Sequence, residues 1–368
     1  MAAGEMTAKE RVKRAMELKV PDRVPVFPVI TAYHASRVLG VRYKEIVLNP
    51  LLAYDTLKAA WEFYGFDGFE VGLGPSSDWK ERMRVEQDGG VEYLVDVETG
   101  KRVARLQEDD GPMPLDTEPP VKSPEDVKKI EIPDHNELIK QGRIEPVKKL
   151  IEEIGDGAFI AGTAASQSMN FLVSQRGSDQ AMLDLVDNPG LAHAIMEIGT
   201  EISIEIGKAL IAAGVDGIYI GDAWASCSII SPRQYKEFCL PYHRKATEAF
   251  HKLGVKVYLH ICGNSDPILE MMADTGVDAI EPLDPLGGVS LASAKRRVGN
   301  RVCLKGGLNT MTLLRGTPED VEREAKRCID DAAAGGGFLL GSGDDIPRDT
   351  PKENLMAMVE TARTYGRY

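Results

Sequence analysis

The sequence predicts an α/β fold in which parallel strands alternate with helices, and three observations support this. Similar phrases recur at 65–70, 214–219 and 276–281, each with a glycine, an aspartate two residues later and a short apolar run. A glycine at this place can end a helix in the left-handed conformation, and the apolar run fits a buried strand. Eight such runs can be found, and capped amphipathic segments lie between them. Alternation of this kind implies parallel pairing, and eight strands close a TIM (β/α)8 barrel.

The elements are expected in the following order. An N-terminal helical segment over 1–22 is predicted, because basic and apolar residues alternate there at helical spacing. Ser231 and Pro232 begin a helix that runs toward Gly254, and Thr317 with Pro318 begins another that runs to Gly335. Both starts combine a hydroxyl cap with proline at the first helical position. The eight strands are predicted at 24–30, 69–73, 158–163, 217–221, 256–261, 279–283, 302–306 and 338–341.

The interval between the second and third strands is too long for one helix, so 77–135 is interpreted as an insertion. It contains a β-hairpin pattern over 85–97 with two glycines at the turn, then a proline-rich loop over 111–133. We therefore expect one decorated barrel domain spanning 1–368. A dinucleotide-binding sheet is the alternative, but no Gly-x-Gly-x-x-Gly phrase follows the early strands.

Composition excludes several classes of function. The chain has 368 residues, with 44 Lys and Arg against 57 Asp and Glu, so its formal net charge is −13. Nucleic-acid binding needs clustered positive charge and is not expected. No apolar run reaches the roughly 18 residues of a membrane span. Five cysteines, an odd number scattered along the chain, fit a reducing compartment, so a cytoplasmic location is expected.

Residues that can bind a metal lie at predicted strand ends, where barrel enzymes place their catalytic groups. His260 and Cys262 are two residues apart on the fifth strand, so their side chains point to the same side. Imidazole and thiolate both suit zinc, and a catalytic zinc site needs three protein ligands with one position open. Asp344 or Glu281, from neighbouring strand ends, is expected as the third ligand. The alternative is an ordinary packed pair with the histidine bonded to backbone.

Other strand ends supply further candidates. Asp222 follows the fourth strand and is expected to orient substrate or exchange a proton, with a loop cap as the alternative. Tyr33 and His34 follow the first strand, and Asn309 ends the seventh, so these three are expected to contact substrate. Asn264 is expected to contact the metal site from just beyond Cys262. Cys227 is an additional thiol near Asp222. Three histidines on predicted outer helices are assigned solvent or helix-end roles: His193, His243 and His251.

Four phrases resemble the uroporphyrinogen decarboxylase superfamily: Leu-His-Ile-Cys-Gly-Asn at 259–264, Leu-Lys-Gly-Gly-Leu-Asn at 304–309, Gly-Thr-Pro-Glu-Asp-Val at 316–321 and Thr-Pro-Lys-Glu-Asn at 350–354. The resemblance covers nearly the whole chain and implies a TIM barrel. It also implies one of two activities, namely cofactor-free porphyrinogen decarboxylation or zinc-dependent methyl transfer with corrinoid proteins. The decarboxylases carry an arginine-rich N-terminal motif for propionates, whereas 24–37 holds a single arginine. The methyltransferase branch is therefore favoured.

In that branch a cysteine follows the eighth strand, and here Asp344 stands near that position. The resemblance implies zinc held by His260, Cys262 and Asp344, with Glu281 as an exchanging ligand. A methyl group would move between a small substrate and the cobalt of a corrinoid (cobalamin) carried by a partner protein. The substrate would be a methoxylated compound, a methylated heteroatom or a thiol.

Two other functions remain open. One is metal-free decarboxylation of the uroporphyrinogen type with Asp222 as acid and base. The other is a barrel that binds corrinoid protein without catalysis. A homodimer is compatible with a barrel surface, but no pattern in the sequence specifies one.

Overall fold

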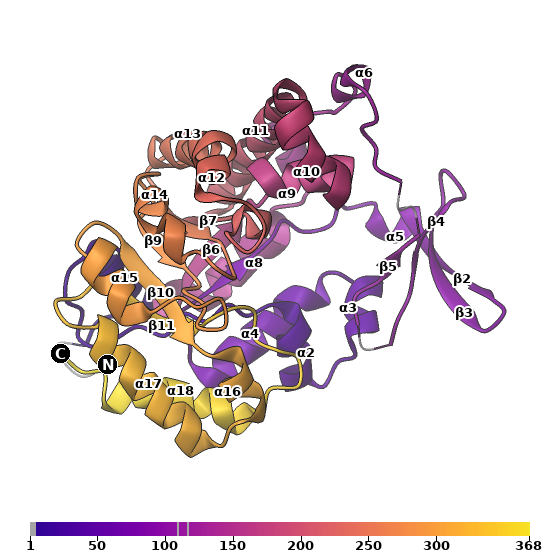
Figure 1. Ribbon diagram of the computed structural model, residues 1–368. Helices are drawn as coiled ribbons and strands as arrows, with labels where there is room; N and C mark the ends of the chain where they lie inside the picture. Colours follow the sequence, from indigo (N-terminus) through magenta and orange to yellow (C-terminus); the bar gives the residue numbers. More distant parts are fainter. Residues whose placement is uncertain (1–4, 109, 116–117) are drawn as a thin grey trace.

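The computed structural model describes residues 5–108, 110–115 and 118–368, which form an α/β fold around a curled parallel sheet (Figure 1). The seven strands follow one another across this sheet in chain order, and each lies at a predicted strand. They are β1 (Gly68–Val71), β6 (Phe159–Thr163), β7 (Gly217–Gly221), β8 (Lys256–His260), β9 (Ala279–Glu281), β10 (Cys303–Leu308) and β11 (Phe338–Ser342). The predicted fold class, α/β with parallel pairing, is confirmed.

The first predicted strand is an extended segment that makes a single parallel bridge, between Val26 and Leu340 of β11. On its other side, the backbone N–H of Asp67 donates to the carbonyl of Val26 at 2.8 Å. The segment therefore links the two edges of the sheet. It does not form a regular ladder because Pro25 and Pro28 have no N–H to donate.

The aspartates of the three recurring phrases share one role at the amino end of the sheet. Each backbone N–H donates to a carbonyl of the neighbouring strand, and each carboxylate accepts the N–H of that same residue. The pairs are Asp67 with Val26 (Oδ2–N 2.8 Å), Asp216 with Ile160 (3.1 Å) and Asp278 with Val257 (2.9 Å). Val26 makes the same two hydrogen bonds with its aspartate that Ile160 and Val257 make with theirs. The segment around Val26 therefore occupies the position of a strand.

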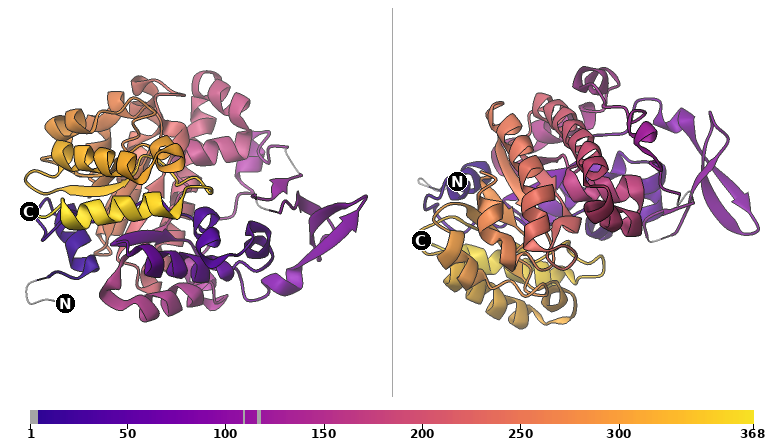
Figure 2. Two further views of the ribbon diagram at one scale, coloured as in Figure 1. Left: turned by 90° about the horizontal axis from the view of Figure 1, so that it is seen from below. Right: turned by 45° about the horizontal axis from the view of Figure 1, so that its top comes forward.

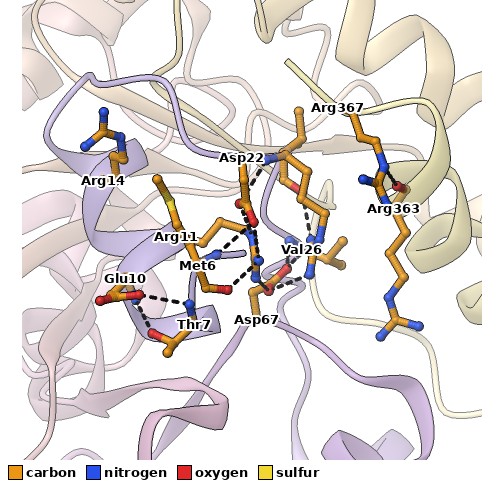
Figure 3. Close-up of polar contacts among 12 residues, drawn as sticks. Met6, Thr7, Glu10, Arg11, Arg14, Asp22, Val26, Asp67, Arg363 and Arg367 are labelled. Atoms are coloured by element: carbon orange, nitrogen blue, oxygen red, sulfur yellow. Dashed lines mark hydrogen bonds and ion pairs between the residues drawn. The ribbon is translucent and has the colours of Figure 1, made fainter. Parts of the chain in front are cut away.

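Arginines hold Asp67 in place (Figure 3). Arg11 of α1 (Ala8–Met16) donates to Asp67 Oδ1 at 2.7 Å and to Asp22 Oδ1 at 2.6 Å. Arg23 donates to Asp67 Oδ2 at 2.7 Å. The side chain of Asp67 is only 2% exposed. This network ties the N-terminal helix to the sheet, and an aspartate buried in this way is stable only with such partners.

Helix α1 closes the amino end of the sheet. Val12, Ala15 and Met16 are buried against inward-facing strand side chains that include Phe27 and Phe159. Residues 1–4 of the predicted segment lie outside the described part of the chain. In the described residues, α1 therefore covers the amino end of the sheet with buried side chains and does not lie on the surface alone.

Helices surround the sheet, as Figures 1 and 2 show. The helix predicted from Ser231 is broken into two at Cys239, and Pro241 lies in the first turn of the second. The helix predicted from Thr317 has the expected hydroxyl cap, which forms a capping box with Asp320, and it ends at Ala332, three residues before the predicted end at Gly335. Between the strands, counting the segment around Val26 as the first, lie α2 (Ala32–Leu39), α3 (Tyr43–Leu48), α4 (Leu52–Tyr64), α7 (His135–Lys140), α8 (Glu145–Ile154), α9 (Ser168–Arg176), α10 (Ser178–Asp187), α11 (Pro189–Ala213), α12 (Pro232–Phe238), α13 (Leu240–His251), α14 (Leu269–Ala273), α15 (Leu291–Val298), α16 (Thr310–Arg315) and α17 (Pro318–Ala332). Helix α18 (Lys352–Thr364) follows β11.

The predicted insertion holds a separate antiparallel sheet that projects from the main body (Figures 1 and 2). Its first two strands pair around Gly89 and Gly90. Its own small core contains Leu94, Ala104 and Leu106. Its elements are α5 (Trp79–Arg82), β2 (Met83–Asp88), β3 (Val91–Asp96), β4 (Arg102–Arg105), β5 (Met113–Pro114) and α6 (Pro124–Val127). Across the described residues, no helix has both the length and the apolar character needed to cross a membrane.

Candidate metal centre

Three potential metal ligands meet at the carboxyl end of the parallel sheet. His260 is the last residue of β8, Cys262 lies two residues beyond it, and Asp344 follows β11. One nitrogen, one sulfur and one oxygen from these residues all lie within 4.8 Å of one another. The distance from His260 Nε2 to Asp344 Oδ1 is 3.8 Å. Because His260 is buried and the other two are half-buried, the group faces both the interior and the open end of the sheet.

This donor set fits zinc. A catalytic zinc ion takes three protein ligands of the nitrogen, sulfur or carboxylate-oxygen type and keeps one position open. Its histidine ligand usually donates the other ring N–H to a carboxylate, which fixes the tautomer. Here His260 Nδ1 donates to Glu281 Oε1 at 3.1 Å, so Nε2 is the ring nitrogen on the side of Asp344 and can serve as the ligand atom.

Glu281 lies behind His260, outside the group of three donors. It was expected as an alternative or exchanging ligand, but its second oxygen accepts a hydrogen bond from Lys305. Lys305 is fully buried and also donates to Glu70 Oε1 at 3.2 Å. Tyr258 donates to the same oxygen of Glu70 at 2.7 Å. A chain of buried polar groups therefore runs beneath the candidate metal centre.

The charges in this chain support one another. Burial lowers the pKa of Lys305, but Glu281 and Glu70 outweigh it, so the pKa lies above its ordinary value. Burial raises the pKa of Glu281, yet Lys305 and His260 bring it below its usual range. For His260, burial lowers the pKa, and hydrogen bonds with Cys262 and Glu281 raise it to about 10. Glu281 is thus held as a carboxylate between the ammonium of Lys305 and the ring N–H of His260.

Two further side chains at this site were not predicted as functional. The ring of Tyr219 lies 5.6 Å from that of His260, and burial, followed by the charges of Glu281 and Glu70, raises its pKa well above the usual value. Asp345 accepts a hydrogen bond from Thr31 Oγ1 at 3.2 Å. Burial raises the pKa of Asp345 to about 7.

A signal for part of this arrangement was present in the sequence. Glu70, Tyr219 and Glu281 are the last residues of the three recurring phrases. Because equivalent positions on parallel strands point to the same side, one inward-facing member predicts the other two.

Asp222 lies in a different environment from the one expected of a catalytic group. It is fully buried and accepts hydrogen bonds from Ser168 Oγ (2.6 Å) and from the N–H of Asn170 (2.8 Å), both in the first turn of α9. His243 Nε2 lies 3.0 Å from its Oδ2. The solvent or helix-end role assigned to His243 is wrong, because its side chain is fully buried. Together they join α9 to α13.

The remaining predicted site residues are placed as follows. The backbone of Asn264 accepts from the N–H of Cys227 at 2.9 Å and donates to Ser228 Oγ at 3.0 Å, so it holds the loop after β8. Asn309 Oδ1 accepts from the N–H of Met311 at 2.8 Å and caps α16. Burial raises the pKa of the Cys227 thiol.

The expected substrate contact of His34 is not supported by its position. Its side chain is 1% exposed, and its ring nitrogens lie 3.1 Å from the carbonyl oxygen of Arg348 and 3.1 Å from the hydroxyl of Tyr64. Tyr33 is half-buried and packs edge-on against Tyr43, with ring centroids 5.1 Å apart. Of these two neighbours, only Tyr33 retains accessible surface for a ligand.

Comparison with known proteins shows the family of this chain. The family description "Uroporphyrinogen decarboxylase (URO-D)" matches residues 104–365. "Methylcobamide:CoM methyltransferase MtbA" of Methanosarcina mazei is 34% identical over 252 residues, which cover 67% of this chain and 70% of that protein. "Uroporphyrinogen decarboxylase" of Chlorobium phaeovibrioides is 30% identical over 256 residues, covering 66% and 70%.

A solved structure, "methyltransferase from Methanosarcina mazei", superposes with a TM-score of 0.77 over 98% of this chain and 99% of that one. Its sequence identity is 24%, so this likeness concerns the fold. The family match covers most of the chain and includes both candidate ligand segments. The chain therefore belongs to the uroporphyrinogen decarboxylase (URO-D) family.

Proposed function

We propose that this protein is a zinc-dependent methyltransferase that moves a methyl group between a small substrate and the cobalt of a corrinoid protein. The observation that carries the proposal is the grouping of His260, Cys262 and Asp344 at the carboxyl end of the sheet. The names of several relatives, which include methylcobamide:CoM and methylated-thiol–coenzyme M methyltransferases, agree with it. The substrate class is a methoxylated compound, a methylated heteroatom or a thiol.

Each residue of the centre has a defined task in this proposal. His260, Cys262 and Asp344 would hold the zinc ion, which when bound supplies a Lewis acid for negative charge on the substrate heteroatom. Glu281 accepts from His260 Nδ1 and so keeps Nε2 available. Asp222 acts as a positioning residue, because it organises the first turn of α9. Tyr33 is the remaining candidate for substrate contact.

The position of the site suggests how a partner binds. The three donors lie at the carboxyl end of the strands, where (β/α)8 enzymes build active sites from loops. We infer an eight-stranded barrel in which the segment around Val26 serves as the first strand. A corrinoid protein would dock over the carboxyl end, so that its cobalt approaches the substrate. Docking with a soluble corrinoid protein is consistent with a cytoplasmic location of this methyltransferase.

Uroporphyrinogen decarboxylation remains the second candidate because decarboxylases are also among the relatives. A substrate with many carboxylates needs several free cations, and arginine is the residue best shaped to bind them. The one arginine within 24–37, Arg37, forms an ion pair with Asp349. The geometry therefore favours methyl transfer.

Metal quantification combined with a methyl-transfer assay tests the proposal. We expect the wild type to contain close to one zinc per chain, Asp344→Ala to lose most of it, and His260→Ala to lose it. Wild type should demethylate methylated corrinoid protein in the presence of an acceptor thiol, or methylate the reduced corrinoid from a methoxylated donor. If the wild type binds no zinc and His260→Ala leaves turnover unchanged, the proposed mechanism is wrong.

A further inference from the structure

Lys305 occupies an unusual place beneath the candidate metal centre. Its side chain is fully buried, and lysine is almost never fully buried unless it is paired. Its ammonium contacts Glu281, lies 3.2 Å from Glu70 Oε1 and sits 4.4 Å from the ring centroid of Phe27. Such a position needs an explanation beyond space filling, which an apolar side chain would provide at lower cost.

Strand register brings Lys305 next to the site. His260 on β8 is paired with Glu281 on β9. Ile280 on β9 is paired with Leu304 on β10, so the next residue, Lys305, stands beside Glu281. Side chains at one level of neighbouring parallel strands point to the same side. His260, Glu281 and Lys305 therefore form a row across three strands.

Both oxygens of Glu281 are used within this row. Oε1 accepts from His260 Nδ1 at 3.1 Å, and Oε2 accepts from Lys305. A carboxylate next to a zinc ligand is itself a good zinc ligand. What distinguishes Glu281 from Asp344 is that its second oxygen is bonded to a buried ammonium, whereas Asp344 is half-buried and lies on the Nε2 side of His260.

We propose that Lys305 is a positioning residue that commits Glu281 to His260 and keeps this carboxylate out of the coordination shell of the metal. A coordination position then stays open for the substrate heteroatom. The inference rests on the proposed zinc function. It adds a reason why one coordination position of the zinc ion would stay open, namely the restraint that Lys305 places on Glu281. A charge-assisted hydrogen bond in a dry interior is strong enough to serve as such a restraint.

The backbone holds Lys305 close to Glu281. Gly306, the next residue of β10, has φ +113°, a left-handed value that favours glycine. A side chain at this position would overlap the carbonyl oxygen of Pro282, the residue after Glu281. The two strands can therefore approach closely only because residue 306 is glycine, and the ammonium of Lys305 reaches Glu281 as a result.

The inference can be tested with cobalt(II) in place of zinc, because the visible absorption of cobalt(II) depends on which ligands surround it. Glu70→Gln serves as the background. It removes one of the two carboxylates around Lys305, so loss of the ammonium leaves a single unpaired charge rather than two. Glu70 does not contact His260 in the hydrogen bonds described above, and we expect Glu70→Gln alone to keep the wild-type spectrum.

In that background, Lys305→Met should shift the visible bands of bound cobalt(II), since the released Glu281 takes the coordination position that is open in the wild type. Adding Glu281→Gln should restore the wild-type spectrum. Zinc affinity, measured by competition with a chelator, should be retained or increased in Lys305→Met. If Lys305 merely supported the fold around His260, affinity would instead fall by about 10–100-fold, as for loss of an outer hydrogen-bond partner.

The outcomes separate the two proposals. An unchanged spectrum in Lys305→Met, or a fall in zinc affinity of that size, overturns the role of Lys305 while the zinc function stands. A wild type that binds neither cobalt(II) nor zinc overturns the proposed function and this inference with it.

Discussion

Asp222 Oδ2 lies 3.0 Å from His243 Nε2, and both side chains are fully buried. The other ring nitrogen of His243 lies 3.2 Å from the hydroxyl of Tyr235. On its opposite side, Asp222 accepts hydrogen bonds from the first turn of α9. The pair therefore connects three helices, α9, α12 and α13, just outside the carboxyl end of β7. These contacts support the proposal that Asp222 is a positioning residue.

Replacing Asp222 with Asn should lower the free energy of unfolding by about 3 kcal/mol, because it removes one partner of a buried pair. Zinc affinity should stay close to that of the wild type, since none of the three candidate ligands contacts Asp222 in the bonds described. Urea denaturation and chelator competition measure the two quantities. Unchanged stability together with lost turnover would instead assign Asp222 a catalytic role.

Replacing Asp344 with Cys should increase zinc affinity, by about tenfold or more, because a thiolate is a softer and stronger zinc ligand than a carboxylate. Chelator competition near neutral pH measures the effect. The matched control is Asp345→Cys, one residue further on, where no gain is expected. Equal gains in the two variants would show that Asp344 is not a ligand.

The aspartate Asp67, which is 2% exposed, should be more important for stability than its less buried counterpart Asp278, which is 14% exposed. Asp67→Asn should reduce the free energy of unfolding by about 3–5 kcal/mol, since Arg11 and Arg23 lose the buried charge they share. Asp278→Asn is the control, because its partners, His251 and Lys256, are part-exposed. A loss of about 1 kcal/mol is expected there. Equal losses in urea denaturation would contradict this ranking.

Stability in acid should depend on Glu205. Burial raises the pKa of Glu205, but Lys208 and the hydrogen bonds donated by His135 outweigh it and lower the pKa to about 2. A carboxylate with a depressed pKa stabilises the fold above its unfolded pKa, and this contribution is lost as pH falls toward the folded value. The stability difference between wild type and Glu205→Gln should therefore be constant near neutrality and shrink between about pH 4.5 and pH 2. A difference that does not change with pH in acid denaturation would exclude this ion pair as its source.

Most of the fold could be predicted because its signals are local. Glycine ends a helix and an apolar run forms the next strand, and these features lie within six residues of each other in each recurring phrase. The irregular first strand was predicted from the same kind of run. Its weak pairing follows from Pro25 and Pro28, which were visible in the sequence. The break at Cys239 likewise follows from Pro241, a residue that the sequence interpretation placed inside one continuous helix.

The part of the site that depends only on the spacing of residues along the sequence could be predicted. His260 and Cys262 share a strand, so their common direction follows from the strand period. The role of Glu281 depends on the register between β9 and β10, which places Lys305 against it, and no local pattern encodes that register. The burial of His34 and His243 depends on which side of each helix faces the sheet. Neither position was predicted correctly, because a lone histidine carries little information about packing.

The three aspartates at the amino end have a consequence for how the molecule opens. Each bonds both the N–H and the carbonyl of one residue on the neighbouring strand, at Val26, Ile160 and Val257. Local opening that exposes these amides must break a side-chain bond as well as a backbone bond, so they should be among the slowest to exchange with solvent. The opposite end of the sheet, which carries the candidate metal ligands, is followed by loops. If a metal binds there as proposed, it would enter or leave through fluctuations at that end while the other end preserves the strand register.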